Sequence, residues 1–300
     1  MHISPPRLRR VVVTGGGGSV GGHLCSRLRA QGVAVVSVDT FTSGCPGHLS
    51  HLADDAGLMI VNHDLEQPLQ VQGPVDLVMH LASPSLLGEE GRLRRVLAGP
   101  HGTRTALELA RDKGARFVFA CGTTGPDDEE LQGGEALTTA YRHAYGMSTA
   151  VARVFDSYGP HMRSQERSTM TTLVQQAFSG GPVLIAGDGS QARSVCYVDD
   201  VVSGLLALSR SGAHGVMEFG DPEPRTLLDL ARTVVDAAGT QAPFLFVNAA
   251  TEAVGAQPDI SRAREVLGWQ PQVALADGVR RTIRAMRESL QGAGLRRLAL

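Results

Sequence analysis

The chain has 300 residues, of which 42% are hydrophobic and 19% charged, and its formal net charge is −2. This length allows one large domain, or one domain with a smaller lobe, and the hydrophobic content is ample for a core. The near-zero charge predicts neither a nucleic-acid-binding surface nor a membrane-binding one, and no apolar run approaches the length of a membrane span.

The four cysteines, at positions 25, 45, 121 and 196, lack metal-ligand spacings such as Cys-x-x-Cys. We interpret them as free thiols in a reducing compartment, which predicts a cytoplasmic protein without a bound metal. The N-terminal ten residues are basic, but the apolar run that follows them is too short for a signal peptide.

A glycine-rich turn follows the first predicted strand, Val11–Val13, and leads into an amphipathic helix. Gly15, Gly18 and Gly21 have the spacing Gly-x-x-Gly-x-x-Gly. N–H groups at a helix N-terminus attract anions, and glycine allows a close approach because it has no Cβ. The stretch therefore predicts a site for a dinucleotide pyrophosphate, although four consecutive glycines are also compatible with a loose turn.

A second predicted strand, 33–38, ends at Asp39, in the region where an acidic residue binds the ribose hydroxyls of a dinucleotide. No Arg or Lys occurs in the next eight residues, so nothing there is suited to a ribose phosphate. We therefore predict NAD rather than NADP, in preference to an exposed aspartate at a strand end.

Strands and helices alternate along the rest of the chain. Further strands are predicted at 58–61, 75–81, 116–121, 149–155, 183–186 and 215–219. Helices are predicted at 48–54, 93–111, 135–145, 168–179, 199–209, 226–238, 262–267 and 275–290, and Gly99-Pro100 must interrupt or start the second of these. The alternation predicts an α/β fold of the Rossmann type, a doubly wound parallel sheet with helices on both faces.

The pattern of short elements changes near residue 160. We expect residues 1–160 to form mainly the NAD-binding domain and residues 161–290 mainly a smaller C-terminal α/β substrate lobe, with room for strands that return to the main sheet. Residues 291–300 are expected to form a loose tail.

Several longer stretches add to these motifs: 14–21, 63–64, 80–82, 152–160, 187–200, 258–261 and 267–269. With them the chain resembles, over residues 10–287, the extended short-chain dehydrogenase/reductases of the NAD-dependent epimerase/dehydratase family, which act on nucleotide-diphosphate sugars. Within that family it is most similar to the UDP-glucuronate decarboxylases.

The resemblance implies a set of site residues and partners. NAD would be held by Gly15, Gly18, Ser19, Val20, Gly21, Asp39, Asp64, Leu65, Leu81 and Ala82. A nucleotide-diphosphate sugar would be contacted by Asp156, Arg193 and Tyr197. Arg193 could instead form a surface ion pair with Asp199 or Asp200. A homodimer would form through the helices at 92–111 and 131–146, with Leu93, Val96, Leu107, Leu137 and Ala140 as its apolar face.

The catalytic Tyr-x-x-x-Lys pair of the family is absent. The chain has a single lysine, Lys113, and none of its tyrosines, at positions 141, 145, 158 and 197, is followed by lysine four residues later. Matching the family's helix places Asp127 at the tyrosine position and Leu131 at the lysine position. The assisting hydroxyl position falls on Gly122 or Thr123.

Three interpretations therefore remain open. In the first, the chain is an enzyme with altered catalytic groups, for which the candidates are Thr123, Thr124 and Asp127; the acidic run 127–130 is otherwise a solvated loop at a helix N-terminus. In the second, it is a non-catalytic NAD- or nucleotide-binding protein that acts through a protein partner. In the third, it catalyses a reaction without hydride transfer.

Three further side chains have chemistry that catalysis could use. Cys121, His80 and His161 are all interpreted as structural rather than as a nucleophile or proton-transfer groups.

Overall fold

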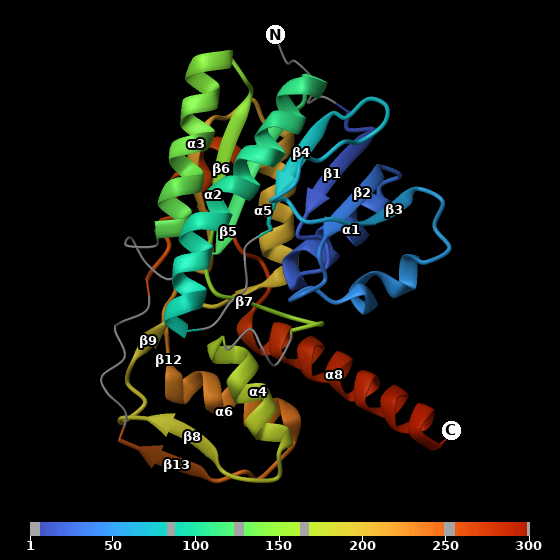
Figure 1. Ribbon diagram of the computed structural model, residues 1–300. Helices are drawn as coiled ribbons and strands as arrows, with labels where there is room; N and C mark the ends of the chain where they lie inside the picture. The colour runs from blue at the N-terminus through green and yellow to red at the C-terminus, as the bar shows by residue number, and fades with distance from the viewer. Residues whose placement is uncertain (1–6, 83–87, 123–128, 163–167, 249–255, 299–300) are drawn as a thin grey trace. The chain divides into compact units, whose positions relative to one another are not determined.

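The computed structural model describes residues 7–82, 88–122, 129–162, 168–248 and 256–298, and the chain divides into two compact units (Figure 1). Unit 1 contains Met1–Val154, Val201–Phe219 and Ile260–Gln270. Unit 2 contains Phe155–Asp200, Gly220–Asp259 and Pro271–Leu300. The chain therefore re-enters the first unit twice.

Unit 1 is built on a seven-stranded sheet in the order β11-β6-β5-β4-β1-β2-β3, with every neighbouring pair parallel. Its strands are β1 (Arg10–Thr14), β2 (Ala34–Asp39), β3 (Leu58–Asn62), β4 (Leu77–His80), β5 (Arg116–Gly122), β6 (Thr149–Val154) and β11 (Gly215–Phe219). The predicted doubly wound parallel sheet is confirmed. The strand order reverses between β1 and β4, which is where ligands bind in sheets of this kind.

Helices cover both faces of this sheet, and Figure 1 shows α2 and α3 side by side on one face. The described helices of unit 1 are α1 (Ser19–Ala30), the 3-10 helix η1 (Pro46–Leu52), α2 (Gly88–Lys113), α3 (Glu129–Tyr145), α7 (Ser261–Leu267) and α5 (Val198–Arg210), whose first three residues belong to unit 2. Coverage on both faces explains why strands such as Val11–Val13 are apolar without alternation.

One cluster of buried side chains joins the sheet to α2 and α3. It includes Val12, Val78, Phe117, Phe119 and Val151 from the strands, and Leu107, Ala110 and Leu131 from the helices. Burial of these apolar side chains stabilises the packing of α2 and α3 against the sheet.

The expectation that Gly99-Pro100 would interrupt or start a helix is wrong, because α2 runs from Gly88 to Lys113 with Pro100 inside it. The Thr103 hydroxyl donates to the Gly99 carbonyl at 3.0 Å. The Pro100 ring lies 3.0 Å from where a Cβ on Gly133 of α3 would stand, so the ring fits against a residue without a side chain. Proline inside a helix costs about 3 kcal/mol, so the helix is maintained here by its tertiary contacts.

Three charged side chains join α3 to the far edge of the sheet. Arg153 of β6 donates to both carboxylate oxygens of Glu135, at 2.6 and 2.9 Å, and lies 3.3 Å from Glu218 of β11. This network of partly buried charges raises the pKa of Arg153. It fixes the position of α3 relative to β6 and β11.

The described residues of unit 2 form short paired strands and three helices. The pairs are β7 (Ser157–Tyr158) with β10 (Cys196–Tyr197), β8 (Val183–Ala186) with β13 (Phe244–Val247), and β9 (Ala192–Arg193) with β12 (Arg225–Thr226). The helices are α4 (Thr169–Phe178), α6 (Leu227–Ala238) and α8 (Leu275–Leu298). The strand β13 was not predicted, because its continuous apolar run lacks the alternation of a strand that is half exposed.

The last helix of unit 2, α8, continues to Leu298, so residues 291–298 are helical rather than the expected loose tail.

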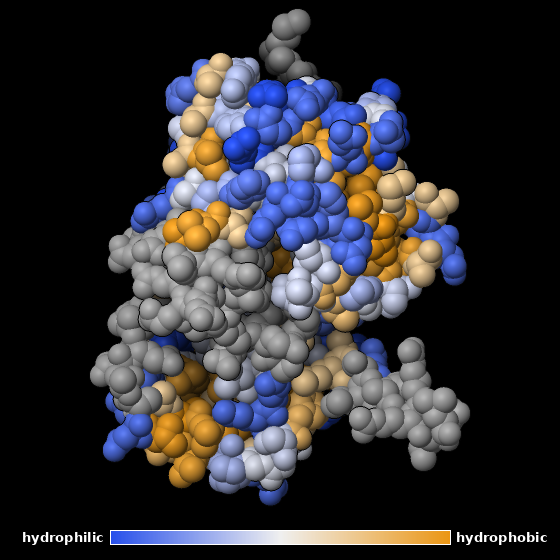
Figure 2. All heavy atoms as spheres, viewed as in Figure 1, coloured by the Kyte–Doolittle hydropathy of each residue, from blue (hydrophilic) through white to orange (hydrophobic). Residues whose placement is uncertain are grey.

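The β8–β13 pair exposes three large apolar side chains, Leu184, Leu245 and Phe246, and Figure 2 shows hydrophobic atoms gathered over this pair.

Two observations concern the chain as a whole. None of the helices within the described ranges is both long and apolar enough to cross a bilayer. The four cysteines are free thiols, and three of them, Cys25, Cys121 and Cys196, are buried.

Candidate functional site

The glycine loop follows the carboxyl end of β1 and requires glycine at two positions. Gly15 has φ +76°, and a Cβ there would lie 2.7 Å from the Ala82 nitrogen and 2.8 Å from the Leu81 oxygen. A Cβ on Gly21 would lie 2.1 Å from the Gly15 oxygen. The loop therefore packs tightly against the chain that leaves β4, and this brings Leu81 and Ala82 to its side.

Helix α1 begins directly after this loop with Ser19 and Val20. Gly18 is its N-cap, and no side chain caps the helix or places an acidic group in its first turn. The first N–H groups of a helix lack intrahelical acceptors and carry a partial positive charge. The glycine cradle and this helix end together fit a pyrophosphate, which needs close backbone donors and no bulky side chain.

Asp39 is the last residue of β2, and its carboxylate links the glycine loop to the loop formed by residues 40–45. One of its carboxylate oxygens accepts the Gly17 N–H at 2.9 Å, and the other accepts the Phe41 N–H at 2.7 Å. The Cys45 N–H donates to the Gly17 carbonyl at 2.9 Å, so residues 40–45 fold over the carboxylate. Each carboxylate oxygen can accept a further bond, which leaves Asp39 able to receive ribose hydroxyls.

Phe41 shapes this region, although no local motif in the sequence singled it out. Its φ of +55° is unusual for a residue with a large side chain. Its ring lies 2.8 Å from where a Cβ on Gly17 would stand. A side chain at Gly17, the third glycine of the run, would therefore meet the ring of a residue 24 positions away in the chain.

Asp64 and Leu65 follow β3 and occupy different surroundings. Asp64 is exposed, and its Oδ1 accepts the Glu66 N–H at 2.9 Å. The His63 N–H donates to the Asp39 carbonyl at 3.1 Å, which places this turn beside the end of β2. Leu65 is buried in the core cluster near Gly102 of α2. The role of both residues beside an adenine stays a prediction.

His80 links β4 to its neighbours through a directed chain of hydrogen bonds. Because the Thr103 hydroxyl donates to a carbonyl, it accepts from Nε2 of His80, at 3.1 Å. Nδ1 then accepts the Thr14 hydroxyl at 2.6 Å. Burial lowers the pKa of His80 to about 3, so the ring is neutral and structural at neutral pH.

Helix α3 begins near the positions that we match to the family's catalytic pair. The candidates Thr123, Thr124 and Asp127 lie outside the described residues. Leu131, at the position matched to the family's lysine, is 3% exposed and belongs to the core cluster. Cys121 is also buried, which disfavours a nucleophilic role.

Three of the tyrosines have raised pKa values. Tyr141 of α3 donates to Glu108 of α2, and burial together with this contact raises the pKa of Tyr141 to about 12. Burial also raises the pKa of Tyr158 and of Tyr197. A base that acts at neutral pH needs a shift in the opposite direction.

In unit 2, the expected substrate residues lie on or beside short strands. The Asp156 carbonyl accepts the Cys196 N–H at 2.9 Å, which joins the β7 and β10 segments. Tyr197 is buried, and its ring packs edge-on against Tyr158 at 5.6 Å. Arg193 is half-buried on β9. Two of the three residues, Asp156 and Tyr197, are therefore brought to one strand pair.

The two aspartates considered as ion-pair partners of Arg193 have other contacts. Asp199 lies 4.0 Å from Arg281, and Asp200 accepts the Val273 N–H at 2.8 Å. The described residues contain no group of three or more His, Cys, Asp or Glu side chains that could hold a metal ion.

The model of the NAD dependent epimerase/dehydratase family matches residues 11–220 of this chain. The chain belongs to this family. The resemblance expected from the motifs is therefore confirmed, and so are the Rossmann-type fold and the expectation of NAD as the cofactor.

Relatives of known activity agree with this assignment. The chain is 31% identical over 317 residues to UDP-glucuronic acid decarboxylase 1 of Arabidopsis thaliana, covering 95% of this chain and 72% of that protein. It is 29% identical over 316 residues to UDP-glucuronic acid decarboxylase 1 of Xenopus tropicalis, covering 96% and 75%.

Solved structures of family members share the fold. A UDP-glucose 4-epimerase from Thermotoga maritima, solved with UDP-glucose, has a TM-score of 0.83 at 23% identity, covering 94% of this chain and 99% of that one. A dTDP-glucose 4,6-dehydratase from Streptomyces venezuelae, solved with NAD, has a TM-score of 0.82 at 24% identity, covering 93% and 97%. These likenesses show the fold of this epimerase/dehydratase family member.

Proposed function

We propose that this family member binds NAD in unit 1 but has an atypical active site that does not carry out the usual oxidation of a nucleotide sugar. One observation carries the proposal: the sequence has no tyrosine followed by lysine four residues later. The geometry that suits a pyrophosphate and ribose is nevertheless present at Gly15, Gly21 and Asp39.

The chemistry explains why this combination matters. Removing hydride from a sugar carbon requires that the hydroxyl proton leave as well, and this needs a base within about 3 Å with a pKa near the working pH. The matched position of the lysine is the buried Leu131. Of the tyrosines, Tyr141, Tyr158 and Tyr197 have raised pKa values. NAD, when bound, would supply the hydride acceptor, but this chain's tyrosines do not supply the base.

The substrate class is proposed from the relatives. Decarboxylases and epimerases similar to this chain act on UDP-glucuronic acid or UDP-glucose according to their names. We infer that a nucleotide-diphosphate sugar is the small molecule that Asp156, Arg193 and Tyr197 of unit 2 recognise. The planar guanidinium of Arg193 suits phosphate oxygens.

Turnover assays test the proposal. The purified protein is incubated with NAD and, separately, UDP-glucuronate, UDP-glucose and dTDP-glucose, while NADH absorbance and products by mass spectrometry are followed. We expect no turnover at rates typical of the relatives. Robust turnover would contradict the proposal, and alanine substitutions at Thr123, Thr124, Asp127 and Cys121 would then identify the replacement group.

A second candidate function is that of a non-catalytic NAD- or nucleotide-binding protein that acts through a protein partner. It is favoured by the same pairing of a complete pyrophosphate loop with a missing base. Calorimetric titration with NAD shows whether the protein still binds the cofactor, which both candidates require. Saturable NAD binding without turnover of any nucleotide sugar supports the binding protein, whereas slow turnover supports an altered enzyme.

A cytoplasmic homodimer is also part of the proposal, with α2 and α3 as the contact. Leu107 does not contribute to its apolar face, because that side chain is fully buried in the core of its own subunit. Leu97 of α2 and Tyr145 of α3, which are 66% and 55% exposed, are available instead. Light scattering at micromolar concentration should give a dimer, and Leu97→Glu should shift it towards monomer.

A further inference from the structure

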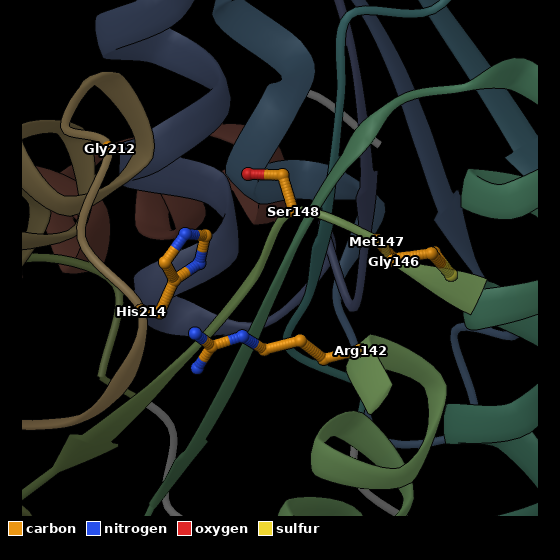
Figure 3. Close-up of a pocket in the computed structure, with 6 residues that line it drawn as sticks. All are labelled: Arg142, Gly146, Met147, Ser148, Gly212 and His214. Carbon is orange, nitrogen blue, oxygen red and sulfur yellow. The ribbon is translucent and has the colours of Figure 1, made fainter. Parts of the chain in front are cut away.

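A hollow of about 410 Å³ opens in unit 1 at the amino ends of two strands (Figure 3). It is lined by Arg142, Gly146, Met147, Ser148, Gly212 and His214. Ser148 directly precedes β6, and His214 directly precedes β11. Since the strands are parallel and the glycine loop follows the carboxyl end of β1, this hollow lies at the opposite edge of the sheet from the cofactor loop.

Arg142 supplies the strongest donor in this hollow. It lies in the last turn of α3 and is half-buried. Figure 3 shows its side chain reaching across the hollow towards His214. Within the described ranges, its guanidinium forms no hydrogen bond and no ion pair. A partly buried guanidinium offers five N–H donors in a planar fork that suits phosphate or carboxylate oxygens.

Two further polar groups complete the lining. Nδ1 of His214 lies 3.1 Å from the Thr149 carbonyl and must donate to it, and in this tautomer Nε2 is an acceptor. The Ser148 hydroxyl oxygen accepts from Arg116 at 2.7 Å, so its own proton is available to another acceptor. Arg142, Ser148 and His214 therefore present polar atoms from two chain segments to one space.

The charge around the hollow is positive. Arg116 donates only to neutral groups, namely Ser148 and the Leu208 and Ala213 carbonyls, and its buried Nε has no hydrogen-bond partner among the described residues. Burial without a balancing carboxylate lowers the pKa of Arg116. Arg262 adds another guanidinium, which donates to the His214 carbonyl at 2.7 Å.

The opposing charges are smaller. Helices α3 and α5 both end near the hollow, and each helix C-terminus carries about half a negative charge. This does not balance the guanidinium groups of Arg116, Arg142 and Arg262, and none of the six lining residues is acidic. An anion would therefore be attracted to the hollow, and a cation would be repelled.

We propose that this hollow is a second binding site, which holds the phosphate group of a small phosphate monoester through Arg142 and Ser148, while Nε2 of His214 accepts from a hydroxyl group of the ligand. Its volume lies in the range of small-molecule sites, roughly 300–1,000 Å³, and exceeds the space that one phosphate needs. The ligand is therefore a phosphorylated metabolite, bound independently of NAD and of any nucleotide sugar.

Calorimetric titration with glycerol 3-phosphate, at an ionic strength held constant with NaCl, tests the proposal. Saturable binding at one site is expected. Arg142→Gln should weaken it by about tenfold or more, because it removes a charge-assisted interaction, and His214→Gln should weaken it less. His143→Gln is the matched control, since His143 is exposed on the same helix but does not line the hollow.

The same variants separate binding in the hollow from misfolding and from binding at the glycine loop. Unchanged NAD binding and circular dichroism in Arg142→Gln show that the variant is folded. Phosphate held by the glycine loop instead would bind equally well to Arg142→Gln, and this result would overturn the proposal. So would the absence of saturable binding, or acetate binding as tightly as glycerol 3-phosphate at equal ionic strength.

Discussion

The glycine loop after β1 and the beginning of α3 after β5 are at the same edge of one parallel sheet, with only β4 between their strands. In the first region, a Cβ added to Gly15 or Gly21 would lie less than 3 Å from backbone atoms, so these positions require glycine. At the second region, Leu131, the residue that we match to the family's lysine, is buried in the core cluster. We propose that the first region keeps the family's cofactor chemistry and that the second has lost its catalytic chemistry.

This difference reflects how each region works. A pyrophosphate is held by backbone N–H groups, so its binding depends on chain geometry that many side-chain changes leave intact. Proton transfer depends on the identity of one or two side chains, and each such group is worth about 10²–10⁴ in rate. Cofactor binding and catalysis therefore depend on different features of the chain and can be lost separately.

The largest expected effect is a loss of NAD affinity when the glycine loop is altered. Gly15→Ala should lower NAD affinity by about 100-fold, since the added Cβ must displace the chain at Leu81 and Ala82 and shift the loop. Gly32→Ala is the matched control, because Gly32 has nearly the same φ, +74°, but nothing within 4 Å of an added Cβ. Equal NAD affinity in the two variants, measured by calorimetry, would show that the close approach does not matter.

The next effect concerns the second region and measures stability. Leu131→Ala should lower the free energy of unfolding by about 2–5 kcal/mol, as expected for a buried leucine, while NAD affinity stays within about twofold of wild type, a change of less than 0.5 kcal/mol. Leu131→Met, which conserves volume, should cost less than about 1.5 kcal/mol. Urea unfolding and calorimetry check both variants. A large loss of NAD affinity without loss of stability would instead make Leu131 a cofactor contact.

His80 lies between the two regions and should give a pH-dependent effect. Its folded pKa of about 3 is below its ordinary value of 6.5, so below pH 6.5 the unfolded chain takes up a proton that the folded chain does not. Stability should therefore fall as the pH drops from 6.5 towards 3, by up to about 1.4 kcal/mol per pH unit from this group. Urea unfolding at several pH values should show a flatter dependence for His80→Asn. An unchanged slope would mean that His80 protonates without cost.

The smallest expected effect concerns Asp39 and the preference for NAD over NADP. Asp39→Asn should weaken NAD binding by about tenfold and reduce the preference for NAD over NADP. An amide has one acceptor oxygen, whereas Asp39 uses two for Gly17 and Phe41, and loss of the negative charge removes repulsion of a ribose phosphate. Asp54→Asn, at an exposed position, matches the change in net charge. Wild-type protein that binds NADP as tightly as NAD would contradict the basis of this prediction.

Local patterns in the sequence determined the parallel sheet and the cofactor loop. The apolar runs of β1 and β4, the glycine spacing after β1 and the acidic end of β2 each depend on residues close together in the chain. Such patterns are set by short-range geometry, namely strand burial, the absence of a Cβ and the start of a helix. Absence of the Tyr-x-x-x-Lys pair was likewise evident without a structure.

Contacts between distant residues decided the rest. Pro100 stays inside α2 because Gly133 of another helix accommodates its ring. Asp39 binds two loops because residues 40–45 fold back over Gly17. The positive hollow exists because β6 and β11 are neighbours in the sheet although more than sixty residues separate Ser148 from His214. No local pattern contains these pairings, since they follow from strand order and from which surfaces the folded chain brings together.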